Sequence, residues 1–363
     1  LFHYHSKASY LSMAEDQSSI DDRPPFSWPE VAKVAARFGS FELVRTLPSE
    51  RDLNFLVRPS GEVGDEAKFV VFKVHNPNDE LDFVECQSLA LEQAAASGAS
   101  CQRLLRTSDT GDAIVSLEVP AKDAGGSPRK CLCRGLSFLP GRMLADAAAK
   151  AAESEELPLL FRAVGEAVGG LTRALLDFQN EAAHREFVWD LQRCERVIGA
   201  HMSDIAEDRQ PLLQRVLQRQ RTELQPLLPK LRRSIVHNDA NDYNLVVAAD
   251  GQVGILDFGD MLYSYTVADA AICMAYLLFH VPDGQSLAES MKPFVESYHA
   301  RCPLEEAEAE ALFGLAIMRV CTSVSMSAYQ SKLEPDNEYL LISAKPAWRL
   351  LERVDAERLD GRE

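Results

Sequence analysis

The chain has 363 residues, and its 46% share of hydrophobic residues can build a sizeable core in each of two domains. Its 38 Lys and Arg residues stand against 55 Asp and Glu residues, and the resulting net charge of −17 argues against nucleic acid or an anionic membrane as a partner. No apolar run approaches the roughly 20 residues that span a bilayer, so we expect no membrane-spanning segment.

The eight cysteines are scattered along the chain and lack the paired spacing that binds zinc. We therefore expect reduced, mostly buried thiols in a cytoplasmic protein. The N-terminus has no continuous apolar stretch and carries His3, His5 and Lys7, which disfavours a signal peptide. Residues 1–27 contain an acidic stretch with Ser and Pro, and are expected to form a flexible lead-in.

Residues 28–139 are predicted to form an N-terminal lobe, a small antiparallel sheet with one inserted helix. Helical spacing of apolar residues marks 28–38, and the inserted helix is predicted at 82–95, after the third strand. The predicted strands lie at 41–47, 54–58, 68–74, 113–119 and 130–138.

Residues 140–363 are predicted to form a larger, mostly helical C-terminal lobe, because long amphipathic patterns follow the Pro140-Gly141 pair. The predicted helices lie at 144–153, 157–180, 188–206, 210–228, 266–280, 287–301, 304–330 and 342–355. The expected fold class is therefore α+β, with a boundary near residue 140.

The stretch 237–260, HNDANDYNLVVAADGQVGILDFGD, combines a predicted β-hairpin with a high density of polar side chains. Two short apolar runs flank an Asp-Gly turn, which is a strong hairpin signal. Asn244 precedes the first strand and Asp257 follows the second, so antiparallel pairing brings both to the open end of the hairpin, with Asp239 nearby. Carboxylate and amide oxygens of this kind are the ligands that Mg²⁺ selects.

This chemistry suggests phosphoryl transfer from a Mg-nucleotide. The reaction needs metal ligands, a cation for the nucleotide phosphates, and a carboxylate that orients and deprotonates the acceptor hydroxyl. Asp239 is the candidate base, and Asn244 and Asp257 are the candidate metal ligands. Lys73, the only cation in the strand-like run FVVFKV, is the candidate phosphate ligand.

The motif His237-Asn238-Asp239, with Asn244 five residues after Asp239 and then Asp257-Phe-Gly259, resembles the signature of the aminoglycoside phosphotransferase and choline kinase superfamily. The resemblance spans about residues 28–355 and implies a protein-kinase-like fold with two lobes. The hydroxylysine kinase branch, including the kinase domains fused to aminotransferase-like domains, is the most similar. The stretches similar to that branch are LPSERDLNFLV (47–57), IVHNDANDYN (235–244), Trp189-Asp190-Leu191 and SAKPAWRLLERV (343–354).

The resemblance implies a nucleotide-phosphate loop at Ser49, Glu50, Arg51 and Asp52. This loop has no glycine, so the Ser49 hydroxyl and backbone N–H groups would contact the phosphates. The family pairs the strand lysine with a glutamate, but here the alignment places Gln87 opposite Lys73. Glu85, on a different helix face, is the alternative partner.

The strand that ends near residue 138 would lead into the segment that holds the purine. Backbone groups of Ser137, Phe138 and Leu139 would then hydrogen-bond the base of ATP or GTP, with Mg²⁺ as the metal cofactor. Both nucleotides remain open as donors.

Other polar residues have a role that the sequence leaves open. His237 is expected to fix the loop through hydrogen bonds, and Asp269 is expected to act as a helix cap or loop brace. Four more side chains either line an acceptor pocket for a cationic substrate or serve local packing and turns. These four are Asp242, Asp260, Trp189 and Asp190.

The favoured function is a small-molecule kinase that phosphorylates the hydroxyl of an amine-containing metabolite such as hydroxylysine. Aminoglycoside, choline, ethanolamine and homoserine acceptors remain alternatives. The fused relatives imply a functional link to a PLP-dependent, aminotransferase-like phospho-lyase. A different class, a nucleotide-binding pseudokinase that serves as a scaffold for such an enzyme, also remains open because of Gln87 and the glycine-free loop. A protein kinase is disfavoured by the short interval after Asp257.

Overall fold

The computed structural model describes residues 23–49, 51–62, 64–119, 129–152, 154–333 and 344–359. The chain divides into two compact units. The first runs to Gly141 and also includes Asn180–Ala183, and the second comprises Arg142–Gln179 and the chain from His184 onward. Most of the expected lead-in, residues 1–22, lies outside the described residues.

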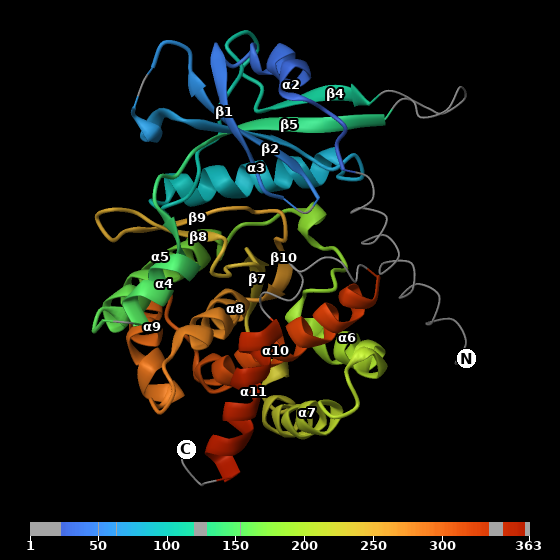
Figure 1. Cartoon of the computed structure of the whole chain (residues 1–363), viewed down its shortest axis with the longest axis vertical. Helices are drawn as coiled ribbons and strands as arrows, with labels where there is room; N and C mark the ends of the chain where they lie inside the picture. Colours follow the sequence, from blue (N-terminus) through green and yellow to red (C-terminus); the bar gives the residue numbers. More distant parts are fainter. Residues whose placement is uncertain are drawn as a thin grey trace. The chain divides into compact units, whose positions relative to one another are not determined.

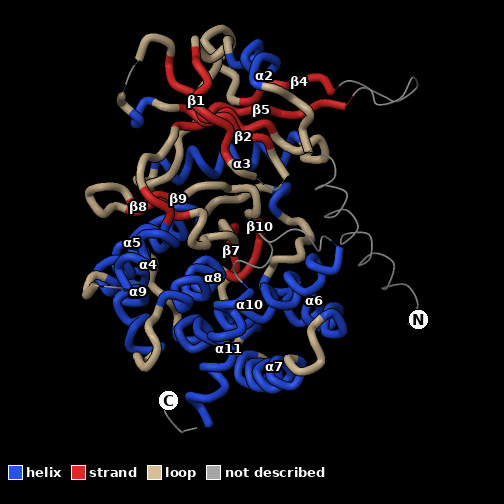
Figure 2. The backbone as a smooth tube through the Cα atoms, viewed as in Figure 1, coloured by secondary structure: helices blue, strands red, loops and turns tan. Residues whose placement is uncertain are grey.

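The first unit is built on a five-stranded sheet with the order β1-β2-β3-β5-β4, and every neighbouring pair is antiparallel (Figures 1 and 2). The expected antiparallel lobe is confirmed, and the first predicted strand has the observed bounds. The strands are β1 (Phe41–Leu47), β2 (Leu53–Pro59), β3 (Val70–Val74), β4 (Ile114–Val119) and β5 (Arg129–Ser137). The helices are α2 (Trp28–Ala35), the 3-10 turn η1 (Glu66–Lys68) and α3 (Leu81–Ala96).

The two faces of strand β3 carry different chemistry because successive side chains of a strand point to opposite sides. Phe72 is fully buried in an aromatic cluster, with its ring centroid 5.2 Å from that of Phe41 and 6.1 Å from that of Trp28. Lys73 faces the other side, and its register partner on β5 is Arg134. One face of the sheet is therefore an apolar core, and the other presents two cations.

The second unit is mostly helical, as predicted. Its α-helices are α4 (Leu144–Ala152), α5 (Leu157–Leu175), α6 (Cys194–His201), α7 (Gln210–Leu224), α8 (Ala268–Leu277), α9 (Leu287–Arg301), α10 (Glu306–Leu333) and α11 (Ala344–Leu359). Short 3-10 turns are η3 (Leu191–Arg193), η4 (Met202–Asp204), η5 (Leu228–Lys230) and η6 (Leu278–His280), while η2 (Glu181–Ala183) belongs to the first unit. The predicted bounds of α9 agree with the observed ones, and the helix predicted over 188–206 is instead broken into η3, α6 and η4.

Two small sheets accompany these helices. The predicted hairpin is present as β8 (Leu245–Val247) and β9 (Val253–Ile255), and β6 (Arg142–Met143) extends it. A second pair, β7 (Arg233–Val236) with β10 (Leu262–Tyr265), was not predicted. These strands are four residues long and far apart in the sequence, so neither shows a clear local alternation.

Helix α10 is the core helix of the second unit. By length and composition alone it could cross a membrane, contrary to the expectation that no apolar run is long enough, but 83% of its apolar window is buried inside the structure. It packs against α6, α7, α8 and α11, which accounts for its apolar character. All eight cysteines are free and buried, as expected, and burial raises the pKa of Cys101 to about 11.

Helices α5 and α9 approach each other closely at Gly165. A Cβ atom at this position would overlap the Phe294 carbonyl oxygen and the Ser297 hydroxyl, both on α9. Gly170, on the same helix, has open space where a Cβ atom would lie. The α5–α9 packing therefore depends on the missing side chain at Gly165.

We expect Gly165→Ala to lower the free energy of unfolding by about 1–3 kcal/mol, because the added methyl group forces α5 and α9 apart. The matched variant Gly170→Ala should be neutral or stabilising by up to about 1 kcal/mol, because alanine favours the helix. Equilibrium urea denaturation of both variants measures this difference. Equal stabilities would contradict the close α5–α9 contact.

Candidate active site

The open end of the β8–β9 hairpin brings the predicted metal ligands together. Leu245 pairs with Ile255, and the Asn244 carbonyl accepts a hydrogen bond of 2.8 Å from the Leu256 N–H. Asn244 therefore lies beside the residue that precedes Asp257. The hairpin register agrees with the one predicted from the Asp-Gly turn and the flanking apolar runs.

Asp239 is held from two sides. Its Oδ2 accepts a hydrogen bond of 2.6 Å from Asn244 Nδ2, and its Oδ1 lies 3.0 Å from Arg319 Nη2. The side chain is 19% exposed, so solvent still reaches the carboxylate. Loss of hydration raises the pKa of Asp239 well above its usual range, repulsion from Asp260 and Asp257 adds to this, and Arg319 opposes it. The site therefore favours a more basic carboxylate.

Asn244 and Asp257 fit a hard divalent cation. Both Asn244 hydrogen bonds to Asp239 use its Nδ2, at 2.6 Å to Oδ2 and 3.0 Å to the carbonyl, so the amide oxygen points away from Asp239. Asp257 is an exposed carboxylate whose Oδ1 accepts the Gly259 N–H at 3.0 Å. An amide oxygen and a carboxylate are suitable ligands for Mg²⁺.

His237 and Asp269 lie under this loop, where the sequence placed them. His237 is fully buried and donates from Nε2 to the Leu256 carbonyl at 2.8 Å, while its Nδ1 accepts the Asp239 N–H at 3.3 Å. Asp269 accepts the backbone N–H groups of His237 at 3.3 Å and Asn238 at 2.8 Å. Together they tie the loop to the hairpin and to the start of α8.

The two loops store backbone strain. Within the described ranges, the non-glycine residues with positive φ are Asn238 at 66° and Asp257 at 50°. Such conformations cost on the order of 1–3 kcal/mol each and concentrate at functional sites. Asn238 directly precedes Asp239, and Asp257 follows the second strand of the hairpin.

Arg319 is a site residue that the sequence analysis missed. It lies in the middle of α10, is 3% exposed, and donates from Nη1 to the Trp189 carbonyl at 3.1 Å. Its Cζ atom lies 4.6 Å from the Trp189 ring centroid, so the cation against this ring is Arg319. A single charge inside a long apolar helix was the signal that could have identified it.

The remaining acceptor candidates differ in their surroundings. Asp190 is buried, caps η3 through the Gln192 N–H and accepts from the Ser264 hydroxyl at 2.6 Å, so it serves local structure. Asp242 is also buried and lies 3.1 Å from His280 Nε2. These contacts favour the local structural role that the sequence left open for both residues, and the acceptor role stays a prediction. Asp260 is half-buried and acts electrostatically on both Asp239 and Arg319, so it stays an acceptor candidate.

In the first unit, Lys73 is paired with Asp52. Lys73 Nζ lies 2.9 Å from Asp52 Oδ2, and both side chains are buried or nearly so, at 8% and 13% exposure. Burial alone would raise the pKa of Asp52, but the positive charge of Lys73 brings it below the usual value. The anion that pairs with the strand lysine therefore comes from the loop before β2.

The expectation that Gln87 orients Lys73 is wrong in this structure. Gln87 Oε1 accepts a hydrogen bond of 2.7 Å from Arg134 Nη2, because Arg134 lies on the α3 side of the sheet. Arg134 also donates from Nε to His75 Nε2 at 3.0 Å. The alternative, Glu85, is exposed and forms no ion pair with the described residues.

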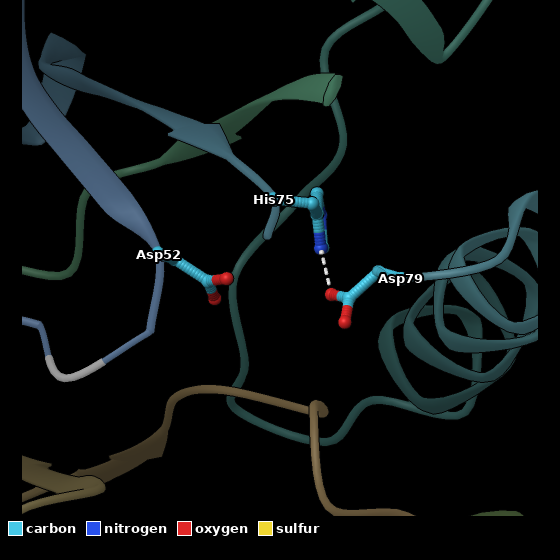
Figure 3. A group of neighbouring side chains, drawn as sticks. All are labelled: Asp52, His75 and Asp79. Carbon is cyan, nitrogen blue, oxygen red and sulfur yellow. Dashed lines mark hydrogen bonds and ion pairs between the residues drawn. The ribbon is translucent and has the colours of Figure 1, made fainter. Parts of the chain in front are cut away.

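His75 continues this polar chain to Asp79, as Figure 3 shows, with 3.1 Å between Nδ1 and Oδ2. Burial, followed by the positive charge of Arg134, lowers the pKa of His75, so the ring stays neutral. Asp52, His75 and Asp79 have the geometry of a metal-binding group. We assign no metal here, because both ring nitrogens of His75 are hydrogen-bonded and Lys73 already neutralises Asp52.

The predicted phosphate loop is tied to the end of β3. Arg51 Nη2 donates to Asp79 Oδ1 at 3.1 Å, and the Asn76 N–H donates to Asp52 Oδ1 at 3.0 Å. The Ser49 hydroxyl accepts the Asp52 N–H at 3.2 Å. Glu50 lies outside the described residues. The Ser49 hydroxyl, which was predicted to contact the nucleotide phosphates, thus accepts a hydrogen bond within its own loop and closes a turn there.

Three of the backbone groups predicted to contact the purine are already hydrogen-bonded within the first unit. Both Ser137 backbone groups are hydrogen-bonded within the unit, its N–H to the Arg103 carbonyl at 2.8 Å and its carbonyl to Gln102 Nε2 at 3.1 Å. The Phe138 N–H donates to the Phe69 carbonyl at 2.9 Å. Leu139 is the member of the predicted set whose N–H makes no hydrogen bond to the described residues.

The chain is similar to known phosphotransferases in sequence. Residues 61–292 match the profile of the family described as "Phosphotransferase enzyme family". A hydroxylysine kinase of Danio rerio is 30% identical over 352 residues, which cover 93% of this chain and 94% of that protein.

Two solved structures support the fold assignment. A microcompartment-associated aminopropanol kinase aligns with a TM-score of 0.66 at 16% identity, covering 91% of this chain and 98% of that one. The amicoumacin kinase hAmiN, solved with AMP-PNP, Ca²⁺ and Ami, aligns with a TM-score of 0.65 at 16% identity, covering 94% and 96%. At this identity the likeness concerns the fold, and it confirms the predicted protein-kinase-like class.

We expect Asp52→Asn to lower the free energy of unfolding by about 1–3 kcal/mol, because it removes the charge next to buried Lys73. The pKa of Asp52 is lowered in the folded protein, so this stabilisation is present above about pH 4 and is lost as the pH falls below it. Denaturation of wild type and variant between pH 3 and 7 measures the effect.

Glu85→Gln is the matched control, because this exposed α3 carboxylate should contribute almost nothing. A stability loss in Glu85→Gln as large as that in Asp52→Asn would contradict the Lys73–Asp52 pair.

Proposed function

The chain belongs to the phosphotransferase enzyme family and is a small-molecule kinase. We propose that it transfers the γ-phosphate of a Mg-nucleotide to a hydroxyl group. The proposed acceptor is a small amine-containing metabolite, and a hydroxylysine-like compound is favoured. The similarity to hydroxylysine kinases over 93% of the chain supports this choice.

The observation that carries the proposal is the arrangement around Asp239. One loop and one hairpin of the second unit hold a carboxylate of raised pKa, an amide oxygen and a second carboxylate together. A protein that only binds nucleotide has no need for a base whose position is fixed by two hydrogen-bond donors. This arrangement favours the kinase over the pseudokinase scaffold.

In the proposed reaction, Asp239 accepts a hydrogen bond from the acceptor hydroxyl and orients its oxygen toward the γ-phosphorus. A new P–O bond forms to that oxygen, the bond from the γ-phosphorus to the bridging oxygen breaks, and the proton passes to Asp239 late in the transfer. The raised pKa of Asp239 suits this role. Asn244 keeps the carboxylate in place through its Nδ2.

The nucleotide roles are assigned residue by residue. Lys73 would contact the phosphates, with Asp52 as the anion that positions it, and the backbone of Leu139 would contact the base. Asn244 and Asp257 would hold Mg²⁺, which neutralises phosphate charge when bound. ATP and GTP are both candidate donors.

The wider setting is also part of the proposal. The reaction product would be a phosphate monoester of an amino alcohol, which a PLP-dependent, aminotransferase-like phospho-lyase could consume by eliminating phosphate. We place the enzyme in the cytoplasm, in keeping with eight free cysteines.

The test is nucleotide consumption by the purified protein with Mg²⁺, using ATP and GTP in turn. The acceptor panel contains hydroxylysine, ethanolamine, choline, homoserine and an aminoglycoside. We expect hydroxylysine to stimulate turnover, and Asp239→Asn to lower kcat by about 100- to 10,000-fold because the base is lost.

Asp250→Asn is the matched control, since Asp250 is an exposed acid in the turn of the same hairpin. It should retain wild-type turnover, and Asp239→Asn should still bind nucleotide. Tight nucleotide binding by the wild type without turnover on any acceptor would instead support the scaffold function.

A further inference from the structure

The segment between the hairpin and β10 holds one of the proposed metal ligands in a strained conformation. Asp257 has a φ of 50°, which costs on the order of 1–3 kcal/mol and persists only where the surrounding structure fixes it. On its N-terminal side the hairpin does so, through the 2.8 Å hydrogen bond from the Leu256 N–H to the Asn244 carbonyl. The chain on its C-terminal side needs support of its own.

Gly259 supports the Asp257 carboxylate directly. Its N–H donates to Asp257 Oδ1 at 3.0 Å, so the carboxylate takes its orientation from this peptide group. A Cβ atom at Gly259 would also lie 3.0 Å from Asp257 Oδ1, closer than a side chain is normally accommodated. Since a glycine has no side chain to anchor it, its position depends on what binds its backbone.

Arg185 binds that backbone from a distant part of the chain. Its Nη2 donates to the Gly259 carbonyl at 3.0 Å, and its Nε donates to the Met261 carbonyl at 3.3 Å. Two donors of one planar guanidinium thus hold two carbonyls that are two residues apart. Hydrogen bonds from a charged donor are stronger than those between neutral groups. Arg185 therefore acts as a clamp on this segment.

The residues on either side of the clamped segment are fixed independently. Phe258 is buried, and its ring meets the His237 ring edge-on with 5.0 Å between the centroids. Leu262 begins β10, which pairs with β7. Residues 259–261 lie between these two anchors, and Arg185 spans them.

The guanidinium of Arg185 is held in place as well. Its Cζ atom lies 4.4 Å from the centroid of the Phe187 ring, so the ring covers one face of the cation. A planar group that is stacked on a ring loses little further conformational freedom when it donates hydrogen bonds. The clamp is therefore preorganised.

We propose that Arg185 is a positioning residue of the metal site, which keeps Asp257 in the orientation that binds Mg²⁺ by fixing the Gly259 and Met261 carbonyls. This inference rests on the proposed kinase function and deepens it. A guanidinium has no acceptor for a cation, so Arg185 acts through the Gly259 peptide and not as a metal ligand. The proposal extends the metal site from the hairpin to the loop before η3.

The charge of Arg185 and its hydrogen bonds predict opposite effects on metal binding. A positive charge near the ligands repels the metal, so loss of the charge alone would tighten binding. Loss of the two carbonyl contacts would release Gly259 and let the strained Asp257 relax, so binding would weaken. We expect the second effect to be larger, because residues that orient metal ligands typically contribute about 10- to 100-fold to metal affinity.

The experiment measures Mn²⁺ binding by electron paramagnetic resonance, with AMP-PNP present, in the wild type, Arg185→Gln and Arg185→Lys. We expect the Mn²⁺ dissociation constant to rise about 10-fold in Arg185→Gln. Arg185→Lys keeps the charge but loses the planar pair of donors, so it should give a smaller rise. The half-saturating Mg²⁺ concentration for turnover should rise in parallel, while the acceptor KM stays unchanged.

Arg193→Gln is the matched control. Arg193 lines the same cavity as Arg185, but its Nη2 pairs with Glu186 Oε1 at 2.6 Å. The substitution removes an equal charge and leaves the two carbonyl contacts intact, so the Mn²⁺ dissociation constant should be unchanged or slightly lower. The same result in Arg185→Gln would overturn the inference.

A second variant covers the case in which Arg185→Gln does not fold, as judged by thermal unfolding. Phe187→Leu removes the ring that covers the guanidinium, and it should raise the Mn²⁺ dissociation constant by a smaller factor; no rise would also contradict the clamp. A wild type that neither binds Mn²⁺ nor turns over refutes the proposed function itself. A wild type that does both, with unaltered Mn²⁺ binding in Arg185→Gln, refutes the positioning role alone.

Discussion

The ion pair between Arg319 and Asp239 is the contact on which the chemistry of the second unit depends. It joins the core helix α10 to the loop before the hairpin, at 3.0 Å, and it sets a fixed cation against a carboxylate whose pKa is otherwise raised by loss of hydration and by Asp260. Asn244 holds the other oxygen from the hairpin. The base is thus positioned by two elements, so the packing of α10 and the hairpin register both control its geometry.

The first unit also holds a buried charged side chain, Lys73, with an oppositely charged partner, Asp52. Strand β3 places Phe72 in an aromatic core and Lys73 on the opposite face. The lysine is neutralised by Asp52, while Arg134 links Gln87 to His75 in a separate set of hydrogen bonds. A loop without glycine is therefore held by side-chain contacts. This arrangement explains how the chain can dispense with a helix glutamate opposite the lysine.

Much of this architecture could be predicted from local sequence patterns. The Asp-Gly turn between apolar runs fixed the hairpin register, and with it the placement of Asn244 beside the segment that holds Asp257. The partners of Lys73 and Asp239 could not be predicted from local patterns. Only the folded structure shows that Asp52, and not Gln87, lies next to Lys73, and Arg319 is 80 residues from Asp239 in the sequence. The pair β7 and β10 was missed for the same reason. Each strand has only four residues and no alternation of buried and exposed side chains, so only their pairing in the fold identifies them as strands.

The measurement we would make first is ³¹P NMR of the reaction mixture with hydroxylysine, Mg²⁺ and nucleotide. We expect a new phosphate monoester resonance coupled to the acceptor carbinol proton, in amounts equal to the nucleoside diphosphate formed. Nucleoside diphosphate accompanied only by inorganic phosphate would mean that water, and not an acceptor hydroxyl, receives the phosphoryl group. That result would contradict the assignment of Asp239 as the residue that orients an acceptor for transfer.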